Sequence, residues 1–269
     1  MEESYDGLLI VNIELTSFCN KNCWMCGRRK IDRDYPNLKL AYGNMDFELL
    51  RKISDQLPPN IVVQFHNNGE PTLYPRFGEA MKLFHRQIRC LDTNGKLLLS
   101  KKDEIIDNVD TITVSTFQDD EDADEQYEIL KEFLRVKGDK KPNVIIRVLG
   151  DIGEGRYNKL KDLGCIIAER ILHSPMGSFK YEKKTTIPEI GVCMEMLSHP
   201  AIDIKGDVST CVRFDPERKS VLGNLSESTL LEIWNSPKRK AWVKKHVEGK
   251  RSDIPLCAKC EFWGIPRGH

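Results

Sequence analysis

The stretch that decides the fold reads TSFCNKNCWMCG from Thr16 to Gly27, directly after the apolar run Leu8–Leu15. Its cysteines, Cys19, Cys23 and Cys26, are spaced C-x3-C-x2-C. A loop this short can turn three thiolates onto one inorganic centre, but it supplies no fourth. Three ligands around a cubane leave one iron open, as a catalytic site requires, whereas a closed structural site fills that position. A zinc site and ordinary buried thiols remain the alternatives, although zinc sites usually combine C-x2-C pairs from two separate places.

The composition is that of an ordinary soluble globular protein, with 40% apolar and 30% charged residues among 269. Such a chain is long enough for one large domain and a small appendage. Lysine plus arginine and aspartate plus glutamate both total 41, so there is no basic excess for non-specific nucleic-acid binding. No apolar run approaches the length that spans a bilayer, and the acidic N-terminus lacks an apolar signal core. We therefore expect a cytoplasmic protein without nucleic-acid or membrane partners.

Nine cysteines are many for a cytosolic chain, and they are unevenly distributed. In a reducing compartment, clustered cysteines indicate metal or redox chemistry rather than disulfides. Beyond the triplet there are two isolated residues and a C-terminal set of four, namely Cys90, Cys165, Cys193, Cys211, Cys257 and Cys260.

Short runs rich in Val and Ile alternate with amphipathic stretches over the first two thirds of the chain. The predicted strands are Leu8–Leu15, Ile61–His66, Ile88–Thr93, Thr111–Thr116, Val144–Leu149 and Ile166–Leu172. The predicted helices are Asp46–Leu57, Arg76–Gln87, Lys101–Asn108, Asp122–Val136 and Gly155–Leu163. Six strands separated by helices predict a parallel sheet with right-handed crossovers. Six rather than eight units fit an incomplete TIM-like α/β barrel, in which function lies at the carboxyl ends of the strands.

The cysteine spacing, together with Asn67–Pro71 after the second strand, resembles the radical S-adenosylmethionine (radical SAM) superfamily. The resemblance implies a partial (β/α)6 barrel and a [4Fe-4S] cluster on Cys19, Cys23 and Cys26. It also implies that the amino and carboxylate groups of SAM chelate the unique iron. Met25 stands where the family usually has an aromatic residue, and its large thioether side chain can still pack against an adenine.

The loop after the second strand looks like the family's G-G-E-P-like motif, which binds the amino group of SAM. Gly permits close approach, Glu accepts hydrogen bonds from an ammonium, and Pro stiffens the loop. Taken alone, the same dipeptides also describe a plain turn. The T-N-G after strand three and the hydroxyls ending strand four extend the resemblance. The predicted SAM-binding residues are Met25, Asn68, Gly69, Glu70, Pro71, Thr93, Asn94, Ser115 and Thr116.

Three residues inside the predicted strands are candidates for catalysis. Arg147 and Arg170 could meet a carboxylate or a polar substrate, although a solvated face or a salt bridge explains each nearly as well. Cys90 could return a hydrogen atom, as in some radical SAM epimerases, but packing in the core explains it and Cys165 better. The acidic run Asp119–Glu125 begins a helix, where carboxylates complement the backbone dipole, so we expect it to face solvent.

The C-terminal hundred residues depart from the alternating pattern. A polar linker from His173 to Pro188 is followed by a predicted hairpin over 202–210, with Gly206-Asp207 at its turn, and a helix over Thr229–Val247. Four cysteines, Cys193, Cys211, Cys257 and Cys260, form a complete thiolate set that also fits a zinc ribbon.

This arrangement resembles the SPASM/twitch extension of radical SAM enzymes, in its shorter form with one auxiliary cluster. The resemblance implies that these four cysteines hold a second, auxiliary [4Fe-4S] cluster. It predicts a partial barrel over residues 1–176 and a SPASM/twitch-like domain over 177–269.

The resemblance implies a 5′-deoxyadenosyl radical that abstracts hydrogen from a small-molecule or peptide substrate. With four protein thiolates, the auxiliary cluster has no open iron and suits electron transfer. The predicted reaction is therefore a dehydrogenase-like two-electron oxidation, with the auxiliary cluster as acceptor and a one-electron reductant such as flavodoxin or ferredoxin. A peptide maturase or an epimerase is the alternative within the family. A zinc-stabilised binding module without radical chemistry is the alternative of another class.

Overall fold

The computed structural model describes residues 4–34, 36, 42–170, 192–212, 215, 217–258 and 260. Leu172, where the sixth strand was predicted to end, lies outside the described residues. So do the predicted linker from His173 to Pro188 and the predicted domain boundary at residues 176 and 177. Every helix within the described ranges is too short or too polar to cross a lipid bilayer.

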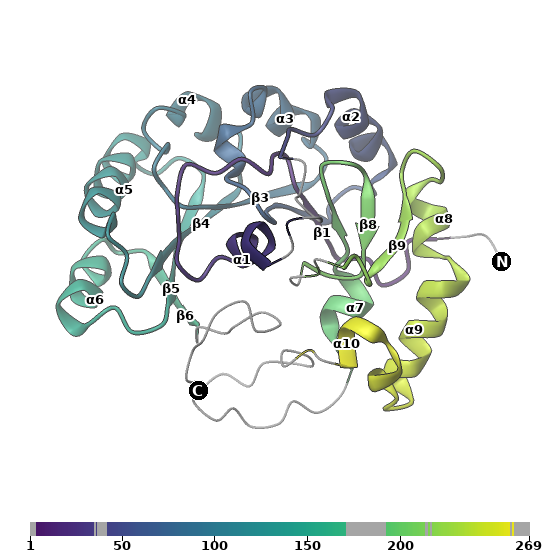
Figure 1. Cartoon of the computed structure of the whole chain (residues 1–269). Helices are drawn as coiled ribbons and strands as arrows, with labels where there is room; N and C mark the ends of the chain where they lie inside the picture. The colour runs from purple at the N-terminus through teal and green to yellow at the C-terminus, as the bar shows by residue number, and fades with distance from the viewer. Residues whose placement is uncertain are drawn as a thin grey trace.

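One nine-stranded sheet runs through the molecule, in the order β6-β5-β4-β3-β2-β1-β7-β8-β9 (Figure 1). Its first six strands follow the chain order and pair in parallel. They are β1 (Ile10–Ile13), β2 (Val62–Phe65), β3 (Ile88–Thr93), β4 (Thr111–Phe117), β5 (Asn143–Leu149) and β6 (Ile166–Arg170). Parallel strands in sequence order, each joined by a crossover, confirm the predicted α/β fold class of a partial TIM-like barrel.

Helices cover the outer side of the curved sheet (Figure 1). They are α2 (Phe47–Gln56), α3 (Phe77–Leu83), α4 (Lys102–Ile105), α5 (Ala123–Lys137) and α6 (Glu154–Lys161). All five were predicted, because each presents an apolar face, and α2 also has an N-cap in Asp46, which accepts hydrogen bonds from two backbone amides. The helix α1 (Gly27–Asp34), directly after the cysteine loop, was not predicted.

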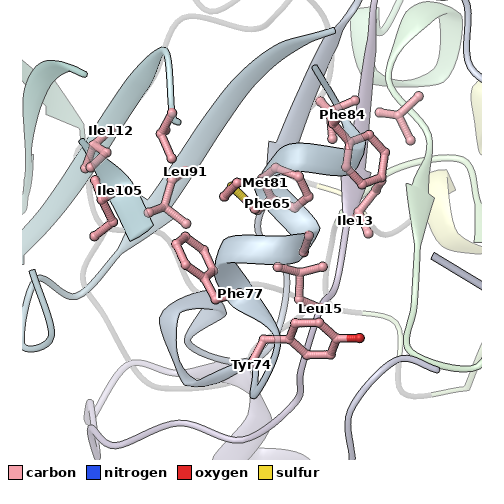
Figure 2. Packing of buried hydrophobic residues seen from close by; sticks show 14 of the residues in the cluster. Ile13, Leu15, Phe65, Tyr74, Phe77, Met81, Phe84, Leu91, Ile105 and Ile112 are labelled. Atoms are coloured by element: carbon pink, nitrogen blue, oxygen red, sulfur yellow. The ribbon is translucent and has the colours of Figure 1, made fainter. Parts of the chain in front are cut away.

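The core lies between the sheet and these helices. Ile13, Phe65, Leu91 and Ile112 pair in register across four strands and are fully buried. Figure 2 shows Ile13, Phe65 and Leu91 beside side chains of the α3 region, and Ile112 beside Ile105. Successive strand residues point to opposite faces. The residues between these apolar ones therefore face the inner side of the curve, and several of them are polar.

The C-terminal segment extends the same sheet. The strand β7 (Ala201–Ile202) pairs in parallel with β1, and β8 (Asp207–Ser209) and β9 (Val221–Asn224) follow antiparallel. The β7–β8 pair is the predicted hairpin, and Gly206 in its turn has a φ of +82°, which glycine adopts without strain. The remaining elements are α7 (Met194–Ser198), α8 (Leu230–Trp234), α9 (Pro237–Val247), a 3-10 turn at Arg251–Asp253 and α10 (Pro255–Ala258).

The prediction of one helix over Thr229–Val247 was wrong, because two helices occupy this stretch. Thr229 and Glu232 form a capping box at the start of α8, which ends at Trp234. Ser236 then caps α9, and Pro237 is its first residue. Proline lacks the backbone N–H that a continuing helix needs, so it favours a new start.

Candidate active site

Three loops meet at the carboxyl edge of the sheet, and the cysteine loop lies among them. The backbone N–H of Glu70, in the loop after β2, donates to the carbonyl of Phe18 over 2.8 Å. The amide Nδ2 of Asn94, after β3, donates to Oδ1 of Asn20 over 2.8 Å and lies 3.9 Å from Sγ of Cys19. The motif residues Glu70 and Asn94 therefore hold the predicted cluster loop against the ends of β2 and β3.

Gly69 is needed for this approach. A Cβ on Gly69 would lie 2.0 Å from the carbonyl oxygen of Thr16 and 2.7 Å from that of Phe18. Both neighbours are backbone atoms that cannot rotate away, so no larger residue fits without moving the cysteine loop.

The three thiols of the loop lie near enough to influence one another. The pKa of Cys23 is raised to about 12, chiefly by burial. The neighbouring Cys26 and Cys19 contribute to this rise, and the charge of Lys21 opposes it. Burial also raises the pKa of Cys19. Thiols that resist ionisation in isolation become thiolate ligands when a cationic centre binds between them.

The donor set fits an iron–sulfur cluster better than a single ion. Among the described residues, no three His, Cys, Asp or Glu side chains are gathered as a lone metal ion requires. A cubane is wider than one ion, so its thiolates stand farther apart. The short loop with Cys19, Cys23 and Cys26 matches the three-thiolate ligation of a cluster with one open iron.

A buried ion pair also holds the cysteine loop, and the sequence interpretation missed it. The ammonium of Lys21 lies 2.7 Å from Oδ2 of Asp120, with side chains that are 3% and 2% exposed. Lys21 also lies over the ring of Phe117, and Trp24 Nε1 donates to the carbonyl of Gln118 over 3.0 Å. The expectation that the acidic run faces solvent was therefore wrong for Asp120. A lysine between cluster cysteines and an aspartate after β4 meet because both follow strands that end at one edge.

Glu70 lies buried between two of these loops. Its carboxylate accepts hydrogen bonds from Thr72 N (3.2 Å), Thr72 Oγ1 (2.6 Å), Thr93 Oγ1 (2.8 Å) and Asn94 N (2.8 Å). Burial raises its pKa, and these four hydrogen bonds oppose the rise. Three of these donors lie on Oε1 and one on Oε2. The side chain thus joins the loops after β2 and β3, and its predicted role as acceptor for the SAM ammonium remains a prediction.

The other predicted SAM-binding residues lie at the same edge, on both faces of the sheet. Pro71 is buried and begins a 3-10 turn over Pro71–Leu73. Ser115 shares the inner face with Arg147, its partner in register. Thr116 points to the opposite face, where its hydroxyl accepts a hydrogen bond from Arg156. Met25 is half-buried in the cysteine loop. Contact of these residues with SAM remains a prediction.

Asn68, also predicted to bind SAM, donates to a buried carboxyl. Asn67 Nδ2 and Asn68 Nδ2 lie 3.0 and 3.3 Å from Oε2 of Glu14, which follows β1. The pKa of Glu14 is raised to about 8, mainly by burial and also by the charge of Asp203. The hydrogen bonds from the two amides and the charge of Arg28 oppose this rise. Glu14 is therefore largely protonated at neutral pH, and the sequence interpretation did not single it out.

A polar network lines the inner face of the sheet beside this edge. Asp92 Oδ2 lies 2.5 Å from Arg147 Nη1 and 3.6 Å from His66 Nδ1, and Asp92 Oδ1 accepts from Gln64 over 3.0 Å. Burial alone would raise the pKa of Asp92, but His66, Arg147 and Gln64 outweigh it and lower the pKa. Asp92 is thus an anion shared by a cation and an imidazole. Of these residues, only Arg147 was predicted.

The other two catalytic candidates are placed less directly. Arg170 ends β6 on the same inner face, in register with Leu149, and is exposed. Cys90 lies two residues deeper than Asp92, on the same face of β3. Burial raises the pKa of Cys90 to about 11, with Asp92 and Asp110 adding to the rise, so it is a neutral thiol. A catalytic role for either remains a prediction.

Three of the C-terminal cysteines lie near one another, and two of them pack in a small apolar cluster. Burial raises the pKa of Cys257 to about 12, with the nearby Cys260 and Cys193 adding to the rise. Cys193 belongs to a small cluster with Met196 and Ile254, against which Cys257 packs. His246 Nε2 lies 3.4 Å from Sγ of Cys257. Three of the four predicted ligands thus gather here, whereas Cys211 follows β8 and its place in the set remains a prediction.

Comparison with known proteins agrees with both cysteine sites. Residues 193–261 match the SPASM family, an iron–sulfur cluster-binding domain. The chain is also similar to the S-adenosyl-L-methionine-dependent 2-deoxy-scyllo-inosamine dehydrogenase of Niallia circulans. The two are 22% identical over 258 residues, which cover 93% of this chain and 92% of the relative. The similarity extends over nearly the whole of both chains.

The chain is a radical SAM enzyme with a SPASM-type domain. A [4Fe-4S] cluster and SAM belong to the N-terminal site of such an enzyme, and iron–sulfur to its SPASM segment. The chain is also similar to the tungsten-containing aldehyde ferredoxin oxidoreductase cofactor-modifying protein of Pyrococcus furiosus. The two are 33% identical over 91 residues, which cover 32% of this chain and 24% of that relative.

Solved structures share the fold of this radical SAM enzyme. BtrN in complex with AdoMet and 2-DOIA has a TM-score of 0.59 at 22% identity, over 95% of this chain and 93% of its own. Native anSMEcpe with bound AdoMet has a TM-score of 0.62 at 17% identity, over 94% and 87%. SuiB of Streptococcus suis bound to S-adenosylmethionine has a TM-score of 0.63 at 15% identity, over 96% and 73%. At these identities the likeness establishes the architecture alone.

Proposed function

We propose that this enzyme oxidises a secondary alcohol of a small polyhydroxylated molecule to a ketone by SAM-dependent radical chemistry. The observation that carries the proposal is the similarity to a SAM-dependent dehydrogenase of an aminocyclitol, which extends over 93% of this chain and 92% of that relative. Similarity over nearly the whole of both chains includes the inner face of the barrel, where substrate binds in folds of this kind.

The polar inner face supports a hydroxyl-rich substrate. An amide, a carboxylate and a guanidinium meet here, because Gln64 and Arg147 each lie within 3.0 Å of a carboxylate oxygen of Asp92. Asn12 lies on the same face, in register with Gln64. A few convergent polar groups of this kind fix the orientation of a small ligand in a pocket.

Each cysteine site has its own part in the proposed reaction. Cys19, Cys23 and Cys26 would hold the cluster that, with SAM, supplies a 5′-deoxyadenosyl radical. Cys193, Cys257 and Cys260, together with Cys211, would hold an iron–sulfur centre that supplies a one-electron acceptor. We propose a flavodoxin or a ferredoxin as the reductant, and the cytoplasm as the compartment where it is met.

The test is hydrogen transfer from substrate to 5′-deoxyadenosine. The protein is reconstituted without oxygen, which should give about eight irons for two cubanes. It is reduced with dithionite in the presence of SAM. Cyclitols, amino sugars and 2-deoxy-scyllo-inosamine, each deuterated at its carbinol carbons, are then offered. We expect at least one to place deuterium in 5′-deoxyadenosine and to appear as a ketone.

The same assay separates the proposal from its rivals. Deuterium transfer from a peptide panel, with none from any carbinol, would replace the alcohol oxidation by peptide modification. Colourless protein with bound zinc and no cleavage of SAM would remove the radical chemistry altogether. A Cys26→Ala variant serves as the blank, since it loses one ligand of the predicted SAM cluster.

A further inference from the structure

We propose that His66 is the general base of the reaction, taking the hydroxyl proton of the substrate while Asp92 orients its imidazole. The inference rests on the proposed function, because it requires an alcohol that is oxidised. His66 directly follows β2, and no motif of the sequence singled it out.

The register of the sheet brings His66 beside Asp92. Phe65 and Leu91 pair across β2 and β3, so His66 and Asp92, the next residues, lie at one level of the inner face. The backbone N–H of His66 donates to the carbonyl of Ile13 over 3.2 Å and fixes this end of the strand. His66 Nδ1 lies 3.6 Å from Asp92 Oδ2. A carboxylate at Nδ1 favours the tautomer that carries its proton there and leaves Nε2 as the acceptor.

The imidazole is also accessible. The side chain of His66 is 37% exposed, whereas that of Asp92 is 5% exposed. Apart from its contact with Asp92, no polar partner of the imidazole is found among the described residues. A base must reach the proton that it removes, and of the two groups only His66 can reach a molecule on the inner face.

The surrounding charges keep this imidazole ready to accept a proton. Burial lowers the pKa of His66, and Arg147, His199 and Arg170 lower it further, while Asp92 opposes them. In that order, these four groups belong to β5, the end of α7, β6 and β3. Glu14, after β1, is largely protonated at neutral pH and so adds little charge. The pKa of His66 is therefore lowered overall. This favours the neutral imidazole at neutral pH, which is the form that acts as a base.

The other titratable groups of the inner face are poorer bases. Glu14, with a pKa of about 8, carries its proton at neutral pH and would donate a hydrogen bond rather than accept a proton. Cys90 is a neutral thiol two residues deeper. Asp92 is already shared between Arg147 and Gln64 and is almost fully buried. His199 also lies beside a carboxylate, that of Glu195 at 3.2 Å, but its side chain is only 14% exposed. Among the described groups that face this site, His66 is the most accessible imidazole held by a carboxylate.

The step balances in atoms and electrons. The carbinol carbon would lose a hydrogen atom to the 5′-deoxyadenosyl radical that bound SAM would supply, so its C–H bond would break and a new C–H bond would form at C5′. The substrate O–H bond then breaks, and an N–H bond forms at Nε2 of His66. One electron leaves the deprotonated substrate radical for the C-terminal iron–sulfur acceptor, and the C=O double bond of the ketone forms. Loss of the proton makes the substrate radical a stronger reductant, so the base assists the departure of the electron.

The first test compares His66→Gln with His85→Gln, an exposed histidine on the outer side of the sheet after α3. With a deuterated alcohol that supports turnover, wild type and His85→Gln should form ketone and labelled 5′-deoxyadenosine in about equal amounts. His66→Gln should still form labelled 5′-deoxyadenosine, but its ketone per 5′-deoxyadenosine should fall at least about a hundredfold, the lower end of the range for loss of a general base. An unchanged ratio overturns the proposal for His66. Absence of any labelled 5′-deoxyadenosine in wild type overturns the proposed function instead.

A second test needs no turnover. Diethyl pyrocarbonate modifies neutral imidazole, and peptide mass spectrometry reports the modified residue. His66 in the reconstituted protein should react with a pH midpoint below the ordinary histidine value of about 6.5. Asp92→Asn should lower that midpoint further, because Asp92 opposes the downward shift. A midpoint at or above the ordinary value, or one that Asp92→Asn leaves unmoved, overturns the assignment whatever the substrate.

Discussion

The two cysteine sites of this molecule are held by opposite means. The N-terminal loop is held by polar contacts from neighbouring strand ends, including the ion pair Lys21–Asp120, and its aromatic residues Phe18 and Trp24 are 47% and 39% exposed. Of the C-terminal cysteines, Cys193 and Cys257 pack in an apolar cluster, where Cys193 is 8% exposed. A site that must admit a cofactor and a substrate needs an open side. A site that only exchanges electrons can be enclosed. The difference predicts which site supplies chemistry and which also stabilises the fold.

The largest effect should come from removing one thiol at each site. Cys23→Ala should abolish cleavage of SAM and leave the thermal unfolding midpoint close to wild type, because polar contacts still hold the loop. Cys257→Ala should retain cleavage of SAM but lower the midpoint, since metal binding contributes directly to the stability of a small cysteine-rich segment. Iron analysis and thermal unfolding of both variants measure this. Equal loss of stability in the two would remove the proposed contrast.

The next effect concerns the buried ion pair of the N-terminal loop. Asp120→Asn leaves the ammonium of Lys21 buried without its nearest anion, which typically costs about 3–5 kcal/mol. The control is Glu132→Gln on α5, whose partner Arg135 is 72% exposed. Breaking such a surface pair changes stability by about 0–1 kcal/mol. Denaturant unfolding of the two variants distinguishes them, and similar values would show that the pair does not hold the loop.

A smaller effect should follow from adding one methyl group at Gly69. Gly69→Ala would force backbone apart at the contact with Thr16, and overpacking of this kind costs about 1–3 kcal/mol. It should also weaken binding of SAM, because the displaced loop carries Cys19. Gly155→Ala on α6 is the control, since nothing lies within 4 Å of a Cβ there and alanine favours a helix. Unfolding and equilibrium binding of SAM test the pair, and a neutral Gly69→Ala would contradict the close approach.

The smallest expected effect is a pH dependence at Glu14. Its pKa of about 8 is raised above the unfolded value. The stability that it contributes is therefore complete below about pH 4.5 and is lost as the pH rises towards 8. Relative to wild type, Glu14→Gln should gain at least about 2 °C in unfolding midpoint between pH 5 and pH 9. Parallel pH profiles for the two proteins would place Glu14 in contact with solvent instead.

Much of the barrel could be predicted from local sequence patterns. The strand over Ile88–Thr93 was predicted to the residue, because a short run with apolar Ile88 and Leu91 lies between helical stretches. The cysteine loop was also evident, since three ligands within eight positions need no tertiary information. The single helix predicted over Thr229–Val247 failed for a local reason, because Pro237 outweighed the amphipathic pattern.

What the sequence by itself determined is the alternation of strands and helices, the two groups of cysteines and hence the radical SAM chemistry. Only the tertiary structure decided which polar side chains meet. Lys21 reaches Asp120 across 99 positions, and Asp92 joins Arg147 across 55. Such pairs depend on strand order and register, which bring distant residues to one edge of the sheet, and no local pattern carries that information. For the same reason His66 looked ordinary in the sequence and becomes a candidate base only beside Asp92.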